Sequence, residues 1–441
     1  MDRLDNPLVL KYCSVSCKDL LINNKQILST KKQDLVNLYN TKIKDKALVN
    51  LKYLSLQEGI IQVICYSSAE NYNKESIRAN IVEMMKTWII YLNEVEKKIT
   101  AQDPSNLTKQ EILAILQLLD VLKSFSRGCF EGLDNSNLSI MAEIFKEIWP
   151  KIKIIINAFS TKSDIIEGII QLTKYFMRGM KDDFKIYLEE YIKCLIDGYK
   201  LAPISSYIYG FEVLLTVFSK DSSVRTIIDN LFSEFCQITF DNYLTSLSDL
   251  TVSCELGEDF FGMLNRLVKL NPFVFFDSPQ IEIIIQLCVG NIGINEIELG
   301  KSIIMLLCKI LTYYKLPEFA GVDQEVINMY ARKINIIVIK YSDEIVRQIL
   351  QTFYEVPPAS ITDLLKDLVF DLILYSGELA LKTFEKHLVS LPSDCLTDKE
   401  KENFISYIRN YNEEKLDQLL DRLIKRCQNK HIRGKNSSKV L

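Results

Sequence analysis

The segment Gly293–Leu307, GINEIELGKSIIMLL, contains Gly300–Ser302, the Gly-Lys-Ser triplet that closes a phosphate-binding P-loop. In a P-loop, backbone N–H groups of a glycine-rich turn surround the phosphates, so the pattern needs another glycine five positions before Gly300. Asn295 occupies that position. The loop also needs a preceding buried strand, whereas Ser278 and Pro279 are typical of a helix N-cap and first helical residue. The sequence therefore favours a helix start over a nucleotide site.

The same segment predicts how that helix begins. Asn295 is expected to be the N-cap, and Glu298 follows three residues later, as in a capping box. Ile294 and Leu299 occupy the two positions of a hydrophobic staple. Gly300 then lies in the first turns, where the absence of a side chain would let a neighbouring helix approach closely.

Residues suited to metal binding or acid–base catalysis are sparse. The chain has 11 cysteines without a C-x-x-C pair and only two histidines, His387 and His431. Cys13 and Cys17 lie one helical turn apart, but no histidine is near enough in sequence to complete a zinc site, so partial burial is the expected role. His387 is expected to be a packing or surface residue. Since G-x-S-x-G and H-E-x-x-H are also absent, we expect no enzyme, no cofactor and no metal site.

Two other groups of residues have alternative interpretations. The carboxylate pairs Asp182–Asp183 and Glu189–Glu190 are interpreted as solvated charge. The aromatic stretch PFVFFDSP, residues 272–279, would suit a partner-binding patch, but phenylalanines that lead into a helix hairpin are more often its core.

The elements that must position any site are helices. Gly (15) and Pro (10) are too few for a large β-protein or a loop-rich α/β enzyme. Between residues 74 and 100, apolar residues recur at steps of three and four, with Glu94 and Lys98 one turn apart on the exposed side. Helix pairs repeat at about 40 to 47 residues, the period of HEAT or armadillo arrays. The expected fold is an all-α superhelix, a solenoid of HEAT-like repeats.

Local signals define several of these helices. Thr108 with Glu111 and Thr397 with Glu400 fit capping boxes. The β-branched runs 151–159 and 334–342 belong to apolar patterns too long for strands, so they are predicted to be helical, and Pro150 is expected to kink its helix. The segments 101–107 and 127–138 are predicted to be loops between repeats.

Charge and hydropathy narrow the class further. A net charge of −4 and a pI near 5.6 argue against direct nucleic-acid binding. No apolar run is long enough to span a membrane, no signal peptide is recognisable, and buried cysteines suit a reducing compartment. Residues 1–428 are predicted to form the solenoid, and the polar, basic segment 429–441 a disordered tail.

Several stretches, in order, resemble the C-terminal half of importin-β superfamily receptors, most closely the transportin-SR branch with importin-13-type receptors as neighbours. They are LSLQEGIIQVICYSSAENYNKESI (54–77), EIFKEIWPKIKIIINAF (143–159), the segment 257–311 from GEDFFGMLNRLVKLNP onward, and LVSLPSDCLTDKEKENFISYI (388–408). The similarity runs from about residue 50 to 425. The order and spacing of these stretches carry the resemblance.

The resemblance implies a non-enzymatic HEAT solenoid that binds protein cargo on its inner surface and shuttles between cytoplasm and nucleus. Its partners would be cargo of a class that includes Arg/Ser-rich splicing factors, the GTPase Ran, and nucleoporins. Family members are longer, and the N-terminal repeats that form the main Ran-GTP site have no counterpart here, so we expect this chain to be part of a larger receptor. Another HEAT scaffold, such as an exportin or a phosphatase-type regulatory subunit, is the alternative.

The resemblance also indicates where cargo would bind. The transportin-SR branch reads phosphorylated Arg/Ser segments with arginines on one inner helix, which corresponds here to residues 163–184. Gly168 and Gln171 stand where arginine is expected, and Lys174 and Arg178 remain basic. These two side chains are one turn apart, so they can share a face and contact a phosphate or a carboxylate. Two solvated bases on an exposed face are the alternative interpretation.

Overall fold

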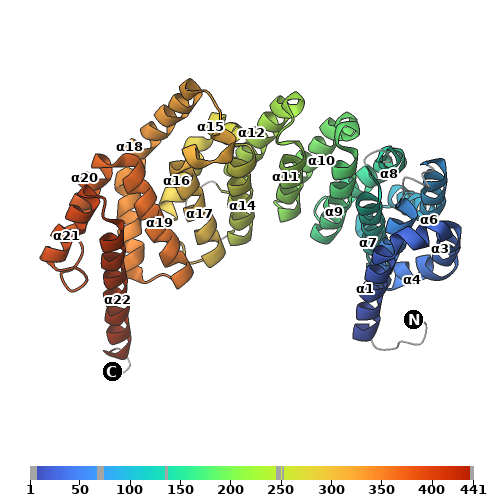
Figure 1. Cartoon of the computed structure of the whole chain (residues 1–441), viewed down its shortest axis with the longest axis horizontal. Helices are drawn as coiled ribbons and strands as arrows, with labels where there is room; N and C mark the ends of the chain where they lie inside the picture. Colours follow the sequence, from blue (N-terminus) through green and yellow to red (C-terminus); the bar gives the residue numbers. More distant parts are fainter. Residues whose placement is uncertain (1–6, 67–73, 135–137, 245–249, 251–252, 438–441) are drawn as a thin grey trace. The chain divides into compact units, whose positions relative to one another are not determined.

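The computed structural model describes residues 7–66, 74–134, 138–244, 250 and 253–437, and the described residues form helices without a strand. The chain divides into two compact units, residues 1–218 and 219–441 (Figure 1). None of the described helices is long and apolar enough to cross a membrane.

Unit 1 is a double layer of helices. Helices α5, α7, α9 and α11 lie side by side in one layer, with α1 against α5, while α6, α8 and α10 form the second layer. The helices of this unit are α1 (Pro7–Asn23), α2 (Lys25–Leu28), α3 (Lys32–Leu38), α4 (Lys44–Val49), α5 (Leu54–Cys65), α6 (Lys74–Ala101), α7 (Lys109–Gly132), α8 (Ser139–Ala158), α9 (Ser163–Met180), α10 (Leu188–Leu201) and α11 (Ser205–Phe218).

Unit 2 repeats the same arrangement. Helices α14, α17 and α19 lie side by side in one layer. In the other layer, α16 packs against α18, and α18 packs against α20. The helices of this unit are α12 (Arg225–Asn242), α14 (Cys254–Leu270), α15 (Pro272–Asp277), α16 (Ile281–Gly290), α17 (Ile297–Leu311), α18 (Gln324–Glu355), α19 (Ala359–Ser376), α20 (Glu378–Leu388), α21 (Asp398–Arg409) and α22 (Glu413–Ser437). The predicted all-α solenoid of paired helices is confirmed.

A chain of buried hydrogen bonds joins the two layers of unit 1. The indole N–H of Trp88 on α6 donates to the hydroxyl of Tyr39 at 2.8 Å, and Tyr39 donates to the side chain of Gln57 on α5 at 3.1 Å. The amide of Gln57 in turn donates to the carbonyl of Val121 on α7 at 2.9 Å. Because each of these buried polar groups has a partner, the chain fixes the register of three helices without an unsatisfied group among its links.

Glycines set the closest approach between neighbouring helices of the first layer. A Cβ at Gly132 on α7 would lie 2.8 Å from the backbone Cα of Gln62 and 2.8 Å from the Cβ of Cys65, both on α5. Those distances are shorter than any van der Waals contact, so only glycine lets α5 and α7 pack this tightly.

Most local predictions are confirmed. Thr108 and Thr397 form complete capping boxes with Glu111 and Glu400. The run 151–158 lies in α8, with Phe159 as its C-cap, and the run 334–342 lies in α18; Pro150 is inside α8, and the kink expected there stays a prediction. In the aromatic stretch 272–279, the rings of Phe275 and Phe276 are buried, as expected of a core.

Three predicted helix boundaries are wrong. Helix α16 begins at Ile281, and the Ser278 hydroxyl caps only the N–H of Gln280. Helix α17 begins at Ile297 without a side-chain cap, so Asn295 is not its N-cap and no capping box forms. Helix α7 continues to Gly132, so residues 127–132 are helical and not part of a loop, while residues 135–137 lie outside the described part of the chain.

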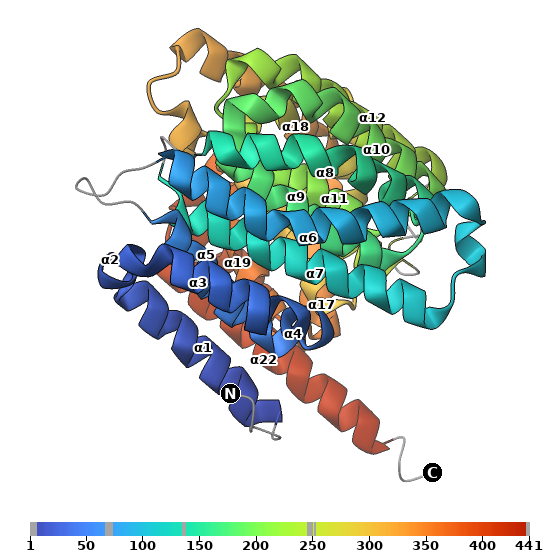
Figure 2. The same cartoon turned by 90° about the vertical axis from the view of Figure 1, so that its right-hand side faces the viewer.

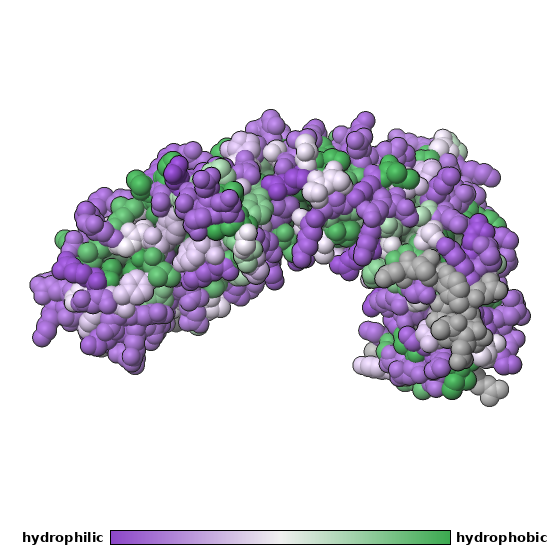
Figure 3. All heavy atoms as spheres, turned by 45° about the horizontal axis from the view of Figure 1, so that its top comes forward, coloured by the Kyte–Doolittle hydropathy of each residue, from purple (hydrophilic) through white to green (hydrophobic). Residues whose placement is uncertain are grey.

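The C-terminal helix reaches into the segment expected to be a disordered tail. Helix α22 ends at Ser437, so residues 429–437 are helical, while 438–441 lie outside the described residues. A division of the chain at residue 428 stays a prediction. In the view of Figure 3, hydrophilic residues dominate the surface and hydrophobic ones appear as scattered groups.

Candidate functional site

The two predicted cargo-binding residues lie on the outward face of α9. The opposite face of this helix is apolar and buried, with Ile166, Ile169, Ile170 and Phe176 among its residues. The helical period then leaves Lys174 and Arg178 half-exposed on the remaining face. The sequence-based expectation that both side chains share one accessible face therefore fits the backbone.

Lys174 is held by two tyrosines. Its ammonium group donates a hydrogen bond of 2.8 Å to the hydroxyl of Tyr209 on α11. The same nitrogen lies 5.6 Å from the ring centroid of Tyr209 and 5.7 Å from that of Tyr175, within the range of cation–π attraction. These contacts restrict the orientation of the lysine without neutralising its charge.

Arg178 lies one turn further along α9. Its side chain is half-exposed, and no hydrogen bond or ion pair of its guanidinium group occurs within the part of the chain that the structure describes. A guanidinium presents five N–H donors in a fixed plane, a geometry that matches a phosphate or a carboxylate. Arg178 therefore offers these donors to a ligand.

Two basic side chains of the same layer, Arg127 on α7 and Lys18 on α1, are paired with carboxylates. Arg127 on α7 forms an ion pair with Glu131 at 2.7 Å and approaches Glu58 on α5 at 3.8 Å. Glu58 also accepts from Lys18 on α1 at 2.6 Å. The hydrogen bond that Arg127 donates to the Glu131 carboxylate is the main reason that the pKa of Arg127 is raised. Lys174 differs from these bases because its hydrogen-bond partner is a neutral phenol and not a carboxylate.

The structure explains why arginine is absent from one of the two positions, 168 and 171, where it was expected. Gly168 faces α7, and a Cβ at this position would lie 3.3 Å from the side chain of Leu119. A longer side chain there would have to displace Leu119 or turn away from α7. Gln171 is half-exposed, and nothing in the structure explains its identity.

Sequence reasoning missed the tyrosines of this site. Tyr209 comes from a different helix and is 35 residues from Lys174, so no local pattern connects the two. Tyr175 adds an aromatic surface that continues to Phe130 on α7, with 6.2 Å between ring centroids. We define the α9 site as Lys174, Arg178 and Tyr209.

The other sequence candidates do not form sites. Lys301 of the Gly-Lys-Ser triplet lies on α17 and pairs with Glu298 at 2.6 Å. A Cβ at Gly300 would lie 3.3 Å from Ile361 on α19, as expected for close helix packing. His387 contacts Asp343 at 3.0 Å. Cys13 and Cys17 are half-buried, and no group of three or more metal-ligand side chains occurs among the described residues.

The carboxylate pairs were only partly interpreted correctly. Glu190 is not merely solvated, because it accepts a hydrogen bond from the indole of Trp149 at 2.9 Å and another from Lys153 at 2.9 Å. The bond from Lys153, followed by that from Trp149, lowers the pKa of Glu190. This carboxylate therefore connects α10 to α8.

The helices that carry the α9 site match a described family. Residues 141–243, from α8 to α12, match the model of the transportin-3/importin-13 fourth TPR domain. This match supports an importin-β/transportin-like receptor for the part of the chain that it covers. Both TPR and HEAT repeats are helix hairpins, so the family's description agrees with the paired helices seen here.

Two curated relatives support the same placement. The chain is 22% identical over 271 residues to transportin MOS14 of Arabidopsis thaliana, and the match covers 60% of this chain and 27% of that protein. It is 20% identical over 240 residues to the uncharacterised protein C11G11.07 of Schizosaccharomyces pombe, covering 53% of this chain and 24% of that protein. Each match therefore spans about a quarter of the relative's length.

A solved structure agrees in fold. An importin-13 structure in its cytosolic state superposes with a TM-score of 0.70 over 94% of this chain and 45% of importin-13, at 13% identity. At this identity the likeness concerns the fold alone. It supports the helical solenoid but assigns no binding residue.

Proposed function

We propose that this chain is a cargo-binding part of a nuclear transport receptor and that the α9 site contacts an acidic or phosphorylated segment of the cargo. The observation that carries the proposal is the pairing of Lys174 with a neutral tyrosine instead of a carboxylate, on a helix within the region that matches the transportin-3/importin-13 model. A half-exposed lysine held in this way keeps its charge for a ligand.

Phosphorylated Arg/Ser segments are the ligand class that suits the site best. A phosphoserine carries about −1.5 to −2 charges near pH 7 and three acceptor oxygens. The ammonium of Lys174 and the guanidinium of Arg178 are donors one helical turn apart, about 5 to 6 Å between Cβ atoms. Two donors at that spacing can contact one phosphate together or two successive acidic residues.

The family placement suggests the remaining partners. Importin and transportin relatives shuttle between nucleus and cytoplasm, so the proposal includes this shuttling, release of cargo by Ran, and passage through nucleoporins. Transport receptors of this family are not enzymes, and the proposed role is binding.

Binding of defined peptides tests the proposal. A fluorescein-labelled Arg-Ser repeat peptide is prepared in phosphorylated, unphosphorylated and Ser-to-Glu forms, and its affinity for the purified chain is measured by fluorescence anisotropy. The double variant Lys174→Glu/Arg178→Glu is expected to weaken binding of the phosphorylated peptide by about tenfold or more.

The control carries the same charge change in the other layer. Lys146 on α8 and Lys193 on α10 are exposed, so Lys146→Glu/Lys193→Glu alters net charge equally without touching α9. This control is expected to bind within about twofold of wild type, because exposed charges beyond about 10 Å are largely screened at 0.1 M salt. Equal losses in both double variants would exclude the α9 site and leave only a nonspecific charge effect.

A further inference from the structure

An open apolar pocket lies where α6 and α7 extend past the helices that cover them. The indole of Trp88 on α6 donates a hydrogen bond to Tyr39, and on α7 the carbonyl of Val121 accepts one from Gln57 of α5. The pocket is lined by residues of α6 that follow Trp88 and by residues of α7 that precede Val121. In Figure 2 this end of the α6–α7 hairpin projects past α4.

The pocket between these two helix segments has a volume of about 270 Å³. Its wall is mainly hydrocarbon, and the apolar residues that line it are Tyr91, Val95, Ile99, Leu107, Ala114, Ile115 and Leu118. Two further apolar side chains on the same helices, Ile90 and Leu113, are 57% and 53% exposed. Ile90 and Leu113 do not line the pocket, whose floor is formed by the buried side chains of Ile99, Ile115 and Leu118; an open apolar hollow of this kind suits an apolar side chain of a partner.

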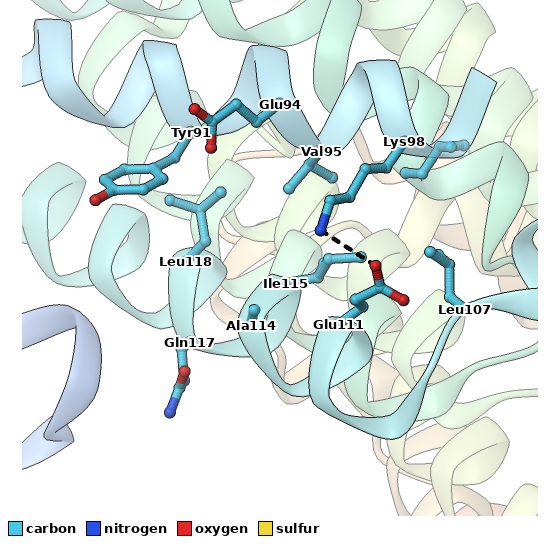
Figure 4. A pocket seen from close by; sticks show the side chains of 11 residues that line it. Tyr91, Glu94, Val95, Lys98, Leu107, Glu111, Ala114, Ile115, Gln117 and Leu118 are labelled. Carbon is cyan, nitrogen blue, oxygen red and sulfur yellow. Dashed lines mark hydrogen bonds and ion pairs between the residues drawn. The ribbon is translucent and has the colours of Figure 1, made fainter. Parts of the chain in front are cut away.

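The charges around the pocket leave one carboxylate unpaired. Lys98 reaches across from α6 to Glu111 on α7, with 3.2 Å between the charged atoms, and not to Glu94 on its own helix (Figure 4). Glu94 also lines the pocket, and its carboxylate is turned toward the opening beside Tyr91 and Leu118 (Figure 4). No ion pair or hydrogen bond of Glu94 occurs among the described residues.

We propose that this pocket docks a short segment of a partner protein that inserts one large aliphatic or aromatic side chain and places a lysine or arginine against Glu94. The cavity is larger than the roughly 150 Å³ that accommodates a benzene molecule, so one such side chain fits. It is smaller than the pockets of about 300 to 1,000 Å³ that hold small-molecule ligands. The exposed Glu94 carboxylate beside the apolar wall is complementary to a cation next to the apolar anchor.

This docking site is independent of the α9 site. The pocket uses α6 and α7, whereas the α9 site uses α9 and α11, and the ligands have opposite charge. Lys174→Glu/Arg178→Glu is therefore expected to leave binding at the pocket unchanged, so failure of one proposal does not entail failure of the other.

Selection from random peptides identifies the ligand directly. A phage-displayed library of 12-residue peptides is selected on the purified full chain, with free soluble chain as competitor. We expect a consensus that contains Leu, Met or Phe and a Lys or Arg within about four positions, the span of one helical turn. The synthetic consensus peptide is then titrated against wild type and variants by fluorescence anisotropy.

A matched pair of alanine substitutions locates the binding. Ala114 is exposed at the pocket wall, so Ala114→Trp fills the opening without entering the core, while Ala79→Trp makes the same change at an exposed position of α6 outside the pocket. Ala114→Trp is expected to reduce the affinity for the consensus peptide by about tenfold or more, and Ala79→Trp by less than about twofold. Thermal melting of both variants verifies that they are folded.

Reversal of the charge at Glu94 tests whether this carboxylate binds a basic residue of the partner. The Glu94→Lys variant is expected to bind the consensus peptide more weakly than wild type does. Its affinity should recover when the basic residue of the peptide is replaced by glutamate. The proposal is overturned if selection yields no apolar-plus-basic consensus, if Ala114→Trp binds as tightly as Ala79→Trp, or if Glu94→Lys does not change the preference.

Discussion

The ammonium nitrogen of Lys174 lies 2.8 Å from the hydroxyl oxygen of Tyr209, and this bond joins α9 to α11 at the proposed cargo site. Because the ammonium group can only donate, the hydroxyl oxygen of Tyr209 accepts, and its own hydrogen remains available to an anion. The pair therefore offers an ammonium group and a phenolic O–H as donors from two helices.

Removal of that hydroxyl is expected to weaken cargo binding. Tyr209→Phe should reduce the affinity for the phosphorylated Arg-Ser peptide by about fivefold, the equivalent of one hydrogen bond of about 1 kcal/mol. The thermal midpoint should change little, because Tyr209 is half-exposed and Phe preserves its packing. Tyr12→Phe on α1, at a highly exposed position, is the control. Unchanged affinity for Tyr209→Phe would show that the hydroxyl does not contact the peptide.

Two glycine substitutions are expected to have opposite effects on stability. Gly132→Ala would force α5 and α7 apart and reduce the free energy of unfolding by about 1 to 3 kcal/mol. Gly262→Ala on α14 has no atom within 4 Å of the added Cβ and should raise the free energy of unfolding by up to about 1 kcal/mol, because alanine favours helix. Urea unfolding followed by circular dichroism measures both, and a neutral or stabilising Gly132→Ala would contradict the packing described for α5 and α7.

The C-terminal hairpin is expected to lose stability in acid through Glu400. Arg426 donates to both carboxylate oxygens, at 2.6 and 2.9 Å, and with the bonds from Thr397 this lowers the pKa of Glu400 to about 2. Since the folded pKa is below the unfolded value of 4.5, the ionised carboxylate stabilises the fold above about pH 4.5, and this contribution disappears as the pH falls toward 2.

The measurement compares wild type with Glu400→Gln in urea at pH 7, 5 and 3.5. The variant should be less stable at pH 7 and 5, and the difference should shrink at pH 3.5. Glu402→Gln, at an exposed position of the same helix, is expected to show no such pH-dependent difference. A constant difference across the series would mean that the Glu400 carboxylate is not the titrating group.

Thiol reactivity is expected to separate the cysteines by burial. Cys427 contacts Cys395, and burial raises the pKa of Cys427 to about 12, so its thiolate is scarce at pH 8. In the native protein, a disulfide reagent such as DTNB should leave the six buried cysteines unmodified until unfolding; they are Cys65, Cys129, Cys236, Cys288, Cys395 and Cys427. The half-buried Cys13 and Cys17 should contribute to the fast phase, which Cys13→Ser/Cys17→Ser would diminish. Rapid labelling of Cys427 in the folded chain would contradict its burial.

Features encoded within one helical turn could be predicted from the sequence. The capping boxes of Thr108 and Thr397 were identified correctly, because each needs only residues three positions apart. The same reasoning failed at Asn295, because α17 begins at Ile297 and Glu296, not Asn295, occupies the N-cap position. A cap competes with the packing of the preceding loop, and that packing is not visible in the local sequence.

The sequence by itself determined the helical class, because the apolar period specifies which face of each helix is buried, and it placed Lys174 and Arg178 on the other face of α9. Only the tertiary structure decided what those side chains meet. Tyr209 reaches Lys174 from another helix, and Lys98 pairs with Glu111 across the pocket although Glu94 is one turn away on its own helix. The physical reason is that such contacts depend on the spacing and rotation of neighbouring helices, which are set by close packing at positions such as Gly132 and not by the local pattern of either helix.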